Sequence, residues 1–425
     1  MRIGIFTESY PPLVNGVSTS IVMLQRALEK QGHDVFIITV GENIKYNLEE
    51  NGKILRLPSV GFAHLYDYKF TSIYPIKAMN IIKKMNLDVI HTNIEFTIGV
   101  FARVVSVQLG IPLVHTYHTK WEDYTHYITK NIKVLDKLSK GAVKYLSIFF
   151  GDKTATELIV PTKKIYDLFK EKYDVKKNIH IVPTGIETYR FYKEQFSSKE
   201  INKLKKFLGL KKRDFVVLTV SRLAKEKSID RLLINHKKIL EKHPDIKFLI
   251  VGDGPDIDKL KDLCVELDIK DSVIFTGKVS LNDIPMYYQL GDVFVTASTT
   301  ETQGLTVIEA MSASVPVVAV NDESFRNSVI NDLSGFIFNT DDEYVEDILK
   351  LYENHELYQR ISNQARILSN DFSSDVFASK VLKVYEQAIE NYNLQNKKIT
   401  SKIKRIFEKR KYKLSENTSQ EETKK

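Results

Sequence analysis

Short apolar runs, mostly of β-branched residues, alternate along the chain with longer stretches whose apolar positions repeat every three to four residues. The short runs predict strands buried on both faces, and the longer stretches predict helices that cover them. The predicted strands form two series: 2–6, 34–40, 54–57, 88–91, 111–116, 155–160 and 179–183, then 214–220, 246–251, 272–276, 292–296, 315–320 and 335–338. The predicted helices include 18–31, 76–86, 96–109, 228–242, 256–267 and 304–313. This alternation predicts α/β architecture with parallel sheets.

The two strand series predict two doubly wound, Rossmann-like domains. A turn-forming Pro183-Thr184-Gly185 and a polar, Lys-rich stretch over 193–213 separate them. Ligands of such sheets bind at the carboxyl ends of the strands, so we expect the active site in a central cleft that the two domains face. We expect an N-terminal domain, a C-terminal domain, a helix that packs back on the domains, and a basic amphipathic segment with a disordered tail: 1–190, 191–371, 372–395 and 396–425.

Composition supports an ordinary globular protein with two to three domains, because 43% of the 425 residues are hydrophobic. This excludes disorder for most of the length and excludes collagen-like and disulfide-rich classes. The single cysteine, Cys264, allows no intramolecular disulfide. The N-terminus lacks the apolar stretch of a secretory signal, and no 18 apolar residues run together. We therefore expect a cytoplasmic protein whose contact with a membrane, if any, is at the surface.

Two basic amphipathic segments stand out from an otherwise neutral chain. Residues 397–413 hold nine Lys or Arg against one acid, Glu408, which accounts for the whole net charge of +8. Residues 132–150 place lysines on one helical stripe and apolar side chains on another: Lys133, Lys137, Lys140 and Lys144, against Leu135, Leu138, Ala142, Tyr145, Leu146 and Phe149. Both segments suit an anionic membrane surface. For 132–150 the alternative is an ordinary core-facing helix, and for the tail it is nucleic acid, which we do not expect because no nucleic-acid-binding module is recognisable.

The strongest chemical motif is STTETQGLTVIEAM, residues 298–311, directly after a predicted strand. Gly304, Leu305 and Thr306 open a helix whose free N–H groups suit a phosphate. Glu309 lies one to two turns into that helix and is placed to reach a ribose hydroxyl, whereas Glu301 in the loop is placed to reach a sugar hydroxyl. The alternative is a helix whose acidic residues only favour its dipole.

A second motif, Ser221 to Lys227, follows the strand 214–220. Arg222 and Lys227 at the carboxyl end of a parallel strand form a cationic clamp for a diphosphate, and the alternative is a solvated charged loop. In the loop after the first strand, Gly16 permits close approach of the backbone to a phosphate or sugar, although a plain turn is the alternative.

Histidines at the end of another strand, in VHTYHTKWEDY (114–124), complete the candidate site. No third ligand cluster accompanies His115 and His118, so we expect no zinc site; one histidine contacts substrate and the other packs. Gly252-Asp253-Gly254 begins a GxGxxG pattern, but Ile257 replaces its third glycine and disfavours nicotinamide binding.

Taken together, FTESYPPLVNGVSTSI, HTYHTKWEDY, PTGIE, SRLAKEKSIDRL, VGDGP and ETQGLTVIEAM resemble retaining glycosyltransferases of the GT-B fold and the family-4 type, over roughly residues 1–390. Among them the chain is similar to the 1,2-diacylglycerol 3-alpha-glucosyltransferases of Gram-positive bacteria and mollicutes. The resemblance implies a nucleotide-sugar donor, retention of anomeric configuration and no essential metal, with a divalent ion at most stimulatory. It also implies that the N-terminal domain, 1–190, binds the acceptor and that the C-terminal domain, 191–371, binds the nucleotide sugar.

The resemblance also implies residue roles. Arg222 and Lys227 would bind the donor diphosphate and stabilise the leaving group, Glu309 would hold the ribose, Glu301 would hold the transferred sugar, and His118 would face the sugar and the acceptor. Backbone groups would contact phosphate or sugar at Gly16, Gly304, Leu305 and Thr306.

Two positions depart from the family pattern. Ser314 stands where glycine is frequent, which we attribute to packing, and Glu8 stands where aspartate is commoner, which puts any acceptor role for Glu8 in doubt.

We expect transfer of glucose from UDP-glucose, or next of galactose from UDP-galactose, to diacylglycerol on the inner face of the cell membrane. The alternatives are addition of a second sugar to a monoglycosyl-diacylglycerol, a soluble or polymeric acceptor, and a non-enzymatic protein that binds nucleotide sugars or uses only its basic tail.

Overall fold

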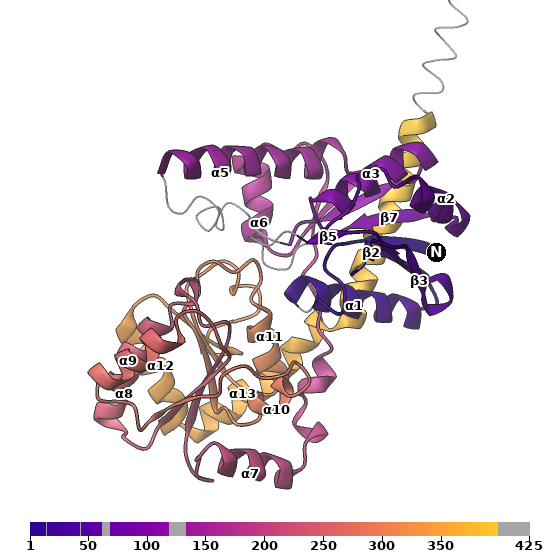
Figure 1. Ribbon diagram of the computed structural model, residues 1–425. Coiled ribbons are helices and arrows are strands. Elements are labelled where there is room, and N and C mark those ends of the chain that lie inside the picture. The colour runs from indigo at the N-terminus through magenta and orange to yellow at the C-terminus, as the bar shows by residue number, and fades with distance from the viewer. Residues whose placement is uncertain (14, 43, 62–68, 119–132, 398–425) are drawn as a thin grey trace, which may run out of the picture.

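Two α/β units, each built on a largely parallel sheet, make up the molecule (Figure 1). The computed structural model describes residues 1–397 except 14, 43, 62–68 and 119–132. The expected basic segment 397–413 and the tail therefore lie outside the described residues, apart from Lys397.

The N-terminal domain contains an eight-stranded sheet in the order β10-β9-β8-β7-β1-β2-β4-β3, in which only the β3–β4 pair is antiparallel. The apolar runs of the sequence become its buried central strands, because a parallel sheet is covered on both faces. Its strands are β1 (Arg2–Phe6), β2 (Asp34–Val40), β3 (Asn47–Glu49), β4 (Ile54–Leu57), β7 (Val89–Thr92), β8 (Leu113–Thr116), β9 (Glu157–Val160) and β10 (Ile179–Ile181). A separate short ribbon pairs β5 (Val60–Gly61) with β6 (Lys69–Phe70).

Helices cover both faces of this sheet. Helix α1 (Gly16–Lys30) and the helix over residues 374–397 pack on one face, and α2 (Ile76–Met85) and α3 (Thr97–Leu109) pack on the other. Helices α5 (Lys133–Ile148) and α6 (Lys163–Asp167) lie beyond the β9–β10 end. The short helical turns of this half are η1 (Glu50–Gly52), η3 (Phe149–Lys153) and η4 (Leu168–Lys172).

The C-terminal domain holds six parallel strands in the order β13-β12-β11-β14-β15-β16. They are β11 (Val216–Val220), β12 (Lys247–Val251), β13 (Val273–Phe275), β14 (Val293–Thr296), β15 (Val317–Val320) and β16 (Gly335–Phe338). The helices around them are α7 (Ser198–Phe207), α8 (Ile229–Lys242), α9 (Ile257–Glu266), α10 (Ile284–Tyr288), α11 (Leu305–Ser312), α12 (Asp341–Glu353) and α13 (His355–Ser369). The short turns are η5 (Thr188–Phe191), η6 (Lys193–Gln195), η7 (Lys225–Lys227) and η8 (Asn370–Phe372).

The chain crosses between the domains twice, and the two crossings touch. Ile186 N–H donates to Phe372 O at 2.9 Å, and Ser374 N–H donates to Ile186 O at 2.8 Å. A Cβ on Gly185 would lie 2.5 Å from Phe377 Cβ and 2.7 Å from Ser373 O, so only glycine lets the two segments pass this closely. After the second crossing the helix 374–397 returns to the N-terminal domain, as the yellow helix of Figure 1 shows.

The expectation of two Rossmann-like α/β domains is confirmed. The stretch 193–213, which looked like a polar linker, contains helix α7, capped by a reciprocal Ser197–Glu200 capping box. The helix expected over 372–395 spans residues 374–397 in the structure.

Candidate functional site

The loop after β11 carries Arg222 and Lys227 and rests on the neighbouring VGDGP loop. Leu223 N–H donates to Asp253 O at 3.0 Å, and a Cβ on Gly252 would lie 2.0 Å from Ser221 O. Gly252 also has φ 133°, which other residues rarely adopt. The glycines of VGDGP thus let the two loops pack backbone to backbone, which supports the loop that presents Arg222 on the surface.

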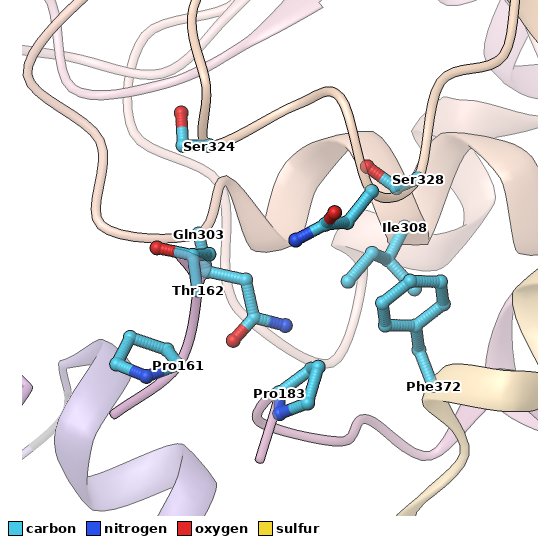
Figure 2. Close-up of a pocket in the computed structure, with 9 residues that line it drawn as sticks. Pro161, Thr162, Pro183, Gln303, Ile308, Ser324, Ser328 and Phe372 are labelled. Carbon is cyan, nitrogen blue, oxygen red and sulfur yellow. The ribbon is translucent and has the colours of Figure 1, made fainter. Parts of the chain in front are cut away.

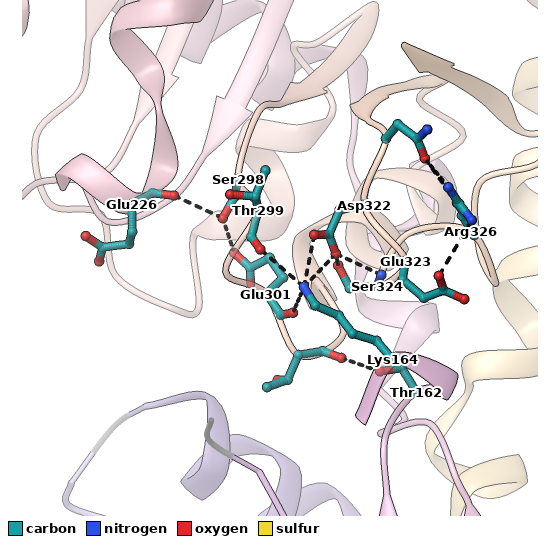
Figure 3. Close-up of polar contacts among 12 residues, drawn as sticks. Thr162, Lys164, Glu226, Ser298, Thr299, Glu301, Asp322, Glu323, Ser324 and Arg326 are labelled. Carbon is teal, nitrogen blue, oxygen red and sulfur yellow. Dashed lines mark hydrogen bonds and ion pairs between the residues drawn. The ribbon is translucent and has the colours of Figure 1, made fainter. Parts of the chain in front are cut away.

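Two predicted site residues are brought into direct contact. Lys227 Nζ donates to Glu301 Oε1, and the ion pair is partly buried. Ser298 Oγ donates to the same carboxylate oxygen at 3.2 Å. Figure 3 shows Glu301 in the loop that follows β14, with Ser298 beside it. The side chain expected to hold the transferred sugar thus lies next to a cation expected to hold the diphosphate.

Gly304 begins helix α11 in a left-handed conformation, with φ 74°. A Cβ at this position would lie 2.4 Å from Phe325 Cε1. Gly304 makes no side-chain cap, and at the helix start the N–H groups of Leu305 and Thr306 have no intrahelical acceptor, whereas Val307 N–H donates to Gly304 O at 3.1 Å. The arrangement suits an anion, as expected from the sequence.

Glu309 lies on α11, and its Oε2 accepts a hydrogen bond of 2.7 Å from Tyr288 Oη. Burial raises the pKa of Glu309 to about 7, an effect only partly opposed by that hydrogen bond. Burial and the carboxylate of Glu309 beside it raise the pKa of the Tyr288 phenol well above its usual value of 10. Glu309 therefore changes charge near neutral pH, which makes any contact it forms with a hydroxyl sensitive to pH.

Gly16 is the first residue of α1, whose N-terminus is closed by a capping box between Asn15 and Ser18. The space around Gly16 is open, because no atom lies within 4 Å of the position a Cβ would take. Gly16 thus leaves room at the carboxyl end of β1 for a bound molecule.

His118 lies at the end of β8, and its Nε2 is 2.8 Å from Asn93 Oδ1. Burial lowers the pKa of His118 to about 4, so the ring is neutral at physiological pH and suits hydrogen bonding better than proton storage. His115 is fully buried, with its Nδ1 3.2 Å from Thr92 O and its Nε2 3.4 Å from Glu95 Oε1. His115 is packed in the core, whereas His118 is partly accessible.

Glu8, at the end of β1, is nearly fully buried. Its Oε1 accepts hydrogen bonds from Ile98 N–H at 2.8 Å and from Thr97 Oγ1 at 3.0 Å, at the N-terminus of α3. Burial raises the pKa of Glu8 to about 7. These contacts give Glu8 a structural task at a helix terminus, whatever it does toward an acceptor.

Side chains of the N-terminal domain also reach the loop of Glu301 in the C-terminal domain (Figure 3). Thr162 Oγ1 donates to Thr302 O at 2.9 Å, and Lys164 Nζ donates to Thr299 O at 3.2 Å. Gln303 exchanges two hydrogen bonds with the backbone of Thr184, at 2.7 and 2.8 Å. The loops after β9 and β10 therefore meet the loop after β14.

A pocket of about 200 Å³, which includes space open to solvent, lies at this junction (Figure 2). It draws its lining from both domains: Pro161, Thr162, Pro183, Gln303, Ile308, Ser324, Asn327, Ser328 and Phe372. Gln303 and Ile308 belong to the 298–311 motif and Pro183 to the turn between the domains, but no residue with a predicted role in donor binding lines this pocket.

The structure thus groups the predicted residues by domain. Arg222, Lys227, Glu301 and the start of α11 lie on loops at the carboxyl ends of β11 and β14, whereas Gly16 and His118 lie at the corresponding ends of β1 and β8. Within the described ranges, no three His, Cys, Asp or Glu side chains gather in a way that could hold a metal ion.

Sequence reasoning missed the residues that join the domains, above all Lys164. Its position four residues after a buried strand end was a usable signal, but its partners lie 135 to 158 positions away in the chain. Only the arrangement of the two domains identifies them.

Known proteins with the same organisation were found by comparison. Residues 14–190 match the domain family Glycosyltransferase Family 4, and residues 200–368 match Glycosyl transferases group 1. An alpha-monoglucosyldiacylglycerol synthase of Streptococcus pneumoniae (strain ATCC BAA-255 / R6) is 35% identical, over 92% of this chain and 83% of the relative. An enzyme of the same name from Acholeplasma laidlawii is 35% identical, over 95% of this chain and 100% of the relative.

A solved structure supports the fold. Anabaena Alr3699/HepE in complex with UDP superposes with a TM-score of 0.71 at 18% identity, over 91% of this chain and 100% of that one. At 18% identity this similarity is evidence for the fold alone. With the two domain families and the two relatives, it shows that the chain belongs to the GT-B glycosyltransferases built from family-4 and group-1 domains.

Proposed function

We propose that the protein transfers glucose from UDP-glucose to diacylglycerol, with retention of configuration, at the surface of a membrane that contains anionic lipid. The observation that carries this proposal is the 35% identity, over more than nine-tenths of the chain, to two alpha-monoglucosyldiacylglycerol synthases. That the match covers both domains supports a shared donor and a shared acceptor.

In the proposed reaction, the bond between glucose and the β-phosphate breaks and leaves UDP with growing negative charge. Arg222 and Lys227 and the free N–H groups at the start of α11 would stabilise that charge, because fixed cations and dipoles act most strongly where charge develops. Glu309 would hold the ribose and Glu301 the hydroxyls of the glucose. In the proposed mechanism these groups bind the diphosphate without an essential metal.

The acceptor hydroxyl would attack the glucose from the same face of the ring from which UDP departs, and a phosphate oxygen of UDP would take the proton of that hydroxyl. No carboxylate nucleophile is then required. His118, held neutral and oriented by Asn93, would donate or accept one hydrogen bond at the sugar or the acceptor. Gly16 would leave space for the diphosphate.

Helix α5 supports the membrane part of the proposal. In the part whose side chains are described, Tyr145 is 69% exposed and Leu146 46%, so the apolar stripe faces solvent rather than the core. Lys144 turns to the protein instead, with its Nζ 3.3 Å from Lys172 O and over the ring of Tyr173. The expected lysines at 133, 137 and 140 lie outside the described side chains.

No helix among the described residues is both long and apolar enough to cross a bilayer. We propose attachment as a peripheral protein on the inner face of the cell membrane, through α5 and through the basic segment 397–413, because basic amphipathic helices bind anionic lipid surfaces.

The test is sugar transfer by the purified full chain to liposomes of diacylglycerol, with and without anionic phospholipid, offering UDP-glucose and UDP-galactose separately. We expect a glucolipid that is alkali-labile, because its acyl chains are ester-linked, and whose formation increases with anionic lipid. Transfer only to monoglucosyl-diacylglycerol, or only from UDP-galactose, would replace the proposed acceptor or donor. Absence of transfer to any lipid would overturn the proposal.

A further inference from the structure

The loop that carries Glu301 is held by its backbone carbonyls, and the groups that hold them come from the other domain. Lys164 Nζ donates to Thr299 O at 3.2 Å and to Glu301 O at 3.3 Å, and Thr162 Oγ1 donates to Thr302 O at 2.9 Å. Three carbonyls within four consecutive residues thus point to the N-terminal domain. A loop outside regular secondary structure has no ladder of its own, so such bonds fix its path.

The third contact of Lys164 fixes the ammonium itself. Both carboxylate oxygens of Asp322 lie 2.9 Å from Lys164 Nζ. Asp322 is oriented in turn by Ser324, whose N–H and Oγ donate to Asp322 Oδ1 at 2.9 and 2.6 Å. With Asp322 and the two carbonyls, the three protons of the ammonium are all used.

This ion pair is sheltered, because the Lys164 side chain is 24% exposed and that of Asp322 is 12% exposed. A sheltered and fully bonded lysine is a more rigid anchor than a surface lysine, whose ion pairs contribute little. The adjacent Lys163 shows the contrast: it is 58% exposed and pairs with Asp167 on its own helix, α6.

Glu301 is thereby held at both ends. Lys164 fixes its backbone carbonyl from the N-terminal domain, and Lys227 and Ser298 contact its carboxylate from within the C-terminal domain. Figure 3 shows the Lys164 side chain extending from its own domain toward Thr299, Glu301 and Asp322. If the two domains moved apart, the first set of contacts would break and the second would not.

We infer that Lys164 is a positioning residue for sugar transfer: it places the Glu301 loop, and through it the Glu301 carboxylate, only while the two domains are together. This inference rests on the proposed function insofar as Glu301 binds the transferred sugar. It couples the sugar-binding carboxylate to domain closure, so that the donor sugar is held in its reactive position only beside the acceptor domain.

The test compares Lys164→Met with the matched control Lys163→Met in the full chain. Transfer from UDP-glucose to diacylglycerol liposomes is measured, together with the affinity for UDP alone. Lys164→Met should lower kcat about 10²-fold, the scale for a displaced positioning group, with UDP affinity within a factor of two. Lys163→Met should behave as the wild type, and Lys164→Arg should recover part of the loss.

A double-mutant cycle tests whether Lys164 acts on catalysis through the Glu301 carboxylate or only links the two domains. In a Glu301→Gln background, Lys164→Met should cost less than threefold, because the carboxylate that it positions is gone. A further loss as large as in the wild type would overturn the inference, as would equal turnover of the two lysine variants.

A second measurement does not depend on the donor or the acceptor. Backbone hydrogen exchange of residues 298–305 should be at least tenfold faster in Lys164→Met than in Lys163→Met, with exchange of the β11–β12 core unchanged. Equal exchange in this segment would overturn the inference. If the wild type transferred no sugar, the proposed function would fail while the exchange result still decided the role of Lys164.

Discussion

Arg222 and Lys227 both lie on the loop after β11, and Lys227 is paired with Glu301. Both should nevertheless matter for the chemical step, because each would meet charge that grows on the departing diphosphate. We expect Arg222→Ala or Lys227→Ala to lower kcat by about two to three powers of ten. Lys225→Ala is the control, because Lys225 is an exposed lysine in the same loop. Unchanged turnover would remove the mutated residue from the site.

The pH dependence of donor binding should report Glu309, whose pKa burial raises to about 7. A ribose hydroxyl binds the carboxylate better than the neutral acid, so donor binding favours the deprotonated form. The donor KM should therefore rise as pH falls below about 7, by up to about tenfold per unit, and level off above pH 8. Steady-state kinetics from pH 5.5 to 8.5 measures this.

Glu309→Gln supplies the control for that profile. At high pH the donor KM of this variant should exceed that of the wild type, with kcat less affected. Its KM should not rise further as the pH falls below about 7, because residue 309 no longer titrates. Glu8 also has a pKa raised to about 7, and its titration is retained in the variant. An unaltered KM profile in Glu309→Gln would assign the pH dependence to another group.

Gly304 combines a left-handed backbone with contact against a ring. Gly304→Ala should destabilise folding by about 2 kcal/mol or more, because the left-handed conformation costs an alanine roughly 1–2 kcal/mol and its Cβ would collide with Phe325. Urea unfolding measures the loss, and Gly304→Ala combined with Phe325→Leu should recover the part that is due to the ring. Wild-type stability of Gly304→Ala would contradict this geometry.

Local backbone geometry is also where sequence reasoning was weakest. We attributed the family's preference for glycine at position 314 to packing, but Ser314 has φ 62°, a conformation that glycine adopts without strain. A side chain's chemistry does not reveal its backbone angles, because these are set by the turn that joins α11 to β15. The acidic and basic site residues were easier to predict, because their positions follow from strand ends.

Helix α5 exposes two neighbouring large apolar side chains, Tyr145 and Leu146, in the part whose side chains are described. We expect Tyr145→Ser combined with Leu146→Ser to lower binding to anionic liposomes by at least about tenfold, since burial of one large apolar side chain contributes roughly 1.5–3 kcal/mol. Phe207→Ser is the control, because Phe207 is 81% exposed on α7 in the other domain. Sedimentation with liposomes measures binding, and equal losses for both variants would contradict a specific membrane contact of α5.

The long apolar strands were largely predictable from the sequence, whereas very short strands and a polar surface helix were not. The expected strand 54–57 is β4 and 335–338 is β16, with the same bounds in the structure. The short strands β3, β5 and β6 were missed, because three residues or fewer do not establish an alternation of apolar and polar positions. Helix α7 was missed because its sequence is polar and none of its residues is buried.

In the molecule as a whole, the helix over residues 374–397 completes the core of the N-terminal domain. Tyr385 Oη lies 2.7 Å from His91 Nδ1, and both side chains are buried. Tyr385→Phe should lower the free energy of unfolding by about 1–3 kcal/mol, because His91 would lose a partner where water cannot replace it. Tyr392→Phe, seven residues further along the same helix, should change it by less than about 0.5 kcal/mol. Denaturant unfolding of both variants measures the difference, and equal values would contradict the assigned hydrogen bond.

Contacts between residues far apart in the chain, such as His91 and Tyr385, could not be predicted from the sequence. A helical repeat after residue 372 predicts a helix, but its packing on the face of β1 and β2 depends on the two crossings at Gly185 and Ser373. The same holds for Lys164 and Asp322, which are 158 positions apart. Contacts of this kind leave no periodic pattern in either segment.

The returning helix also sets an order of events during synthesis. Val381, Val384, Tyr385 and Ala388 cover Ile5, Ile21 and Ile37 in the N-terminal core, so that core stays uncovered on one side until nearly 400 residues have been made. At 5–20 residues per second, about 10–40 s pass between translation of residue 190 and of residue 388. During that interval the nascent first domain exposes an apolar face that chaperones would recognise, and a ribosome stalled before residue 374 would display a chain unable to close it.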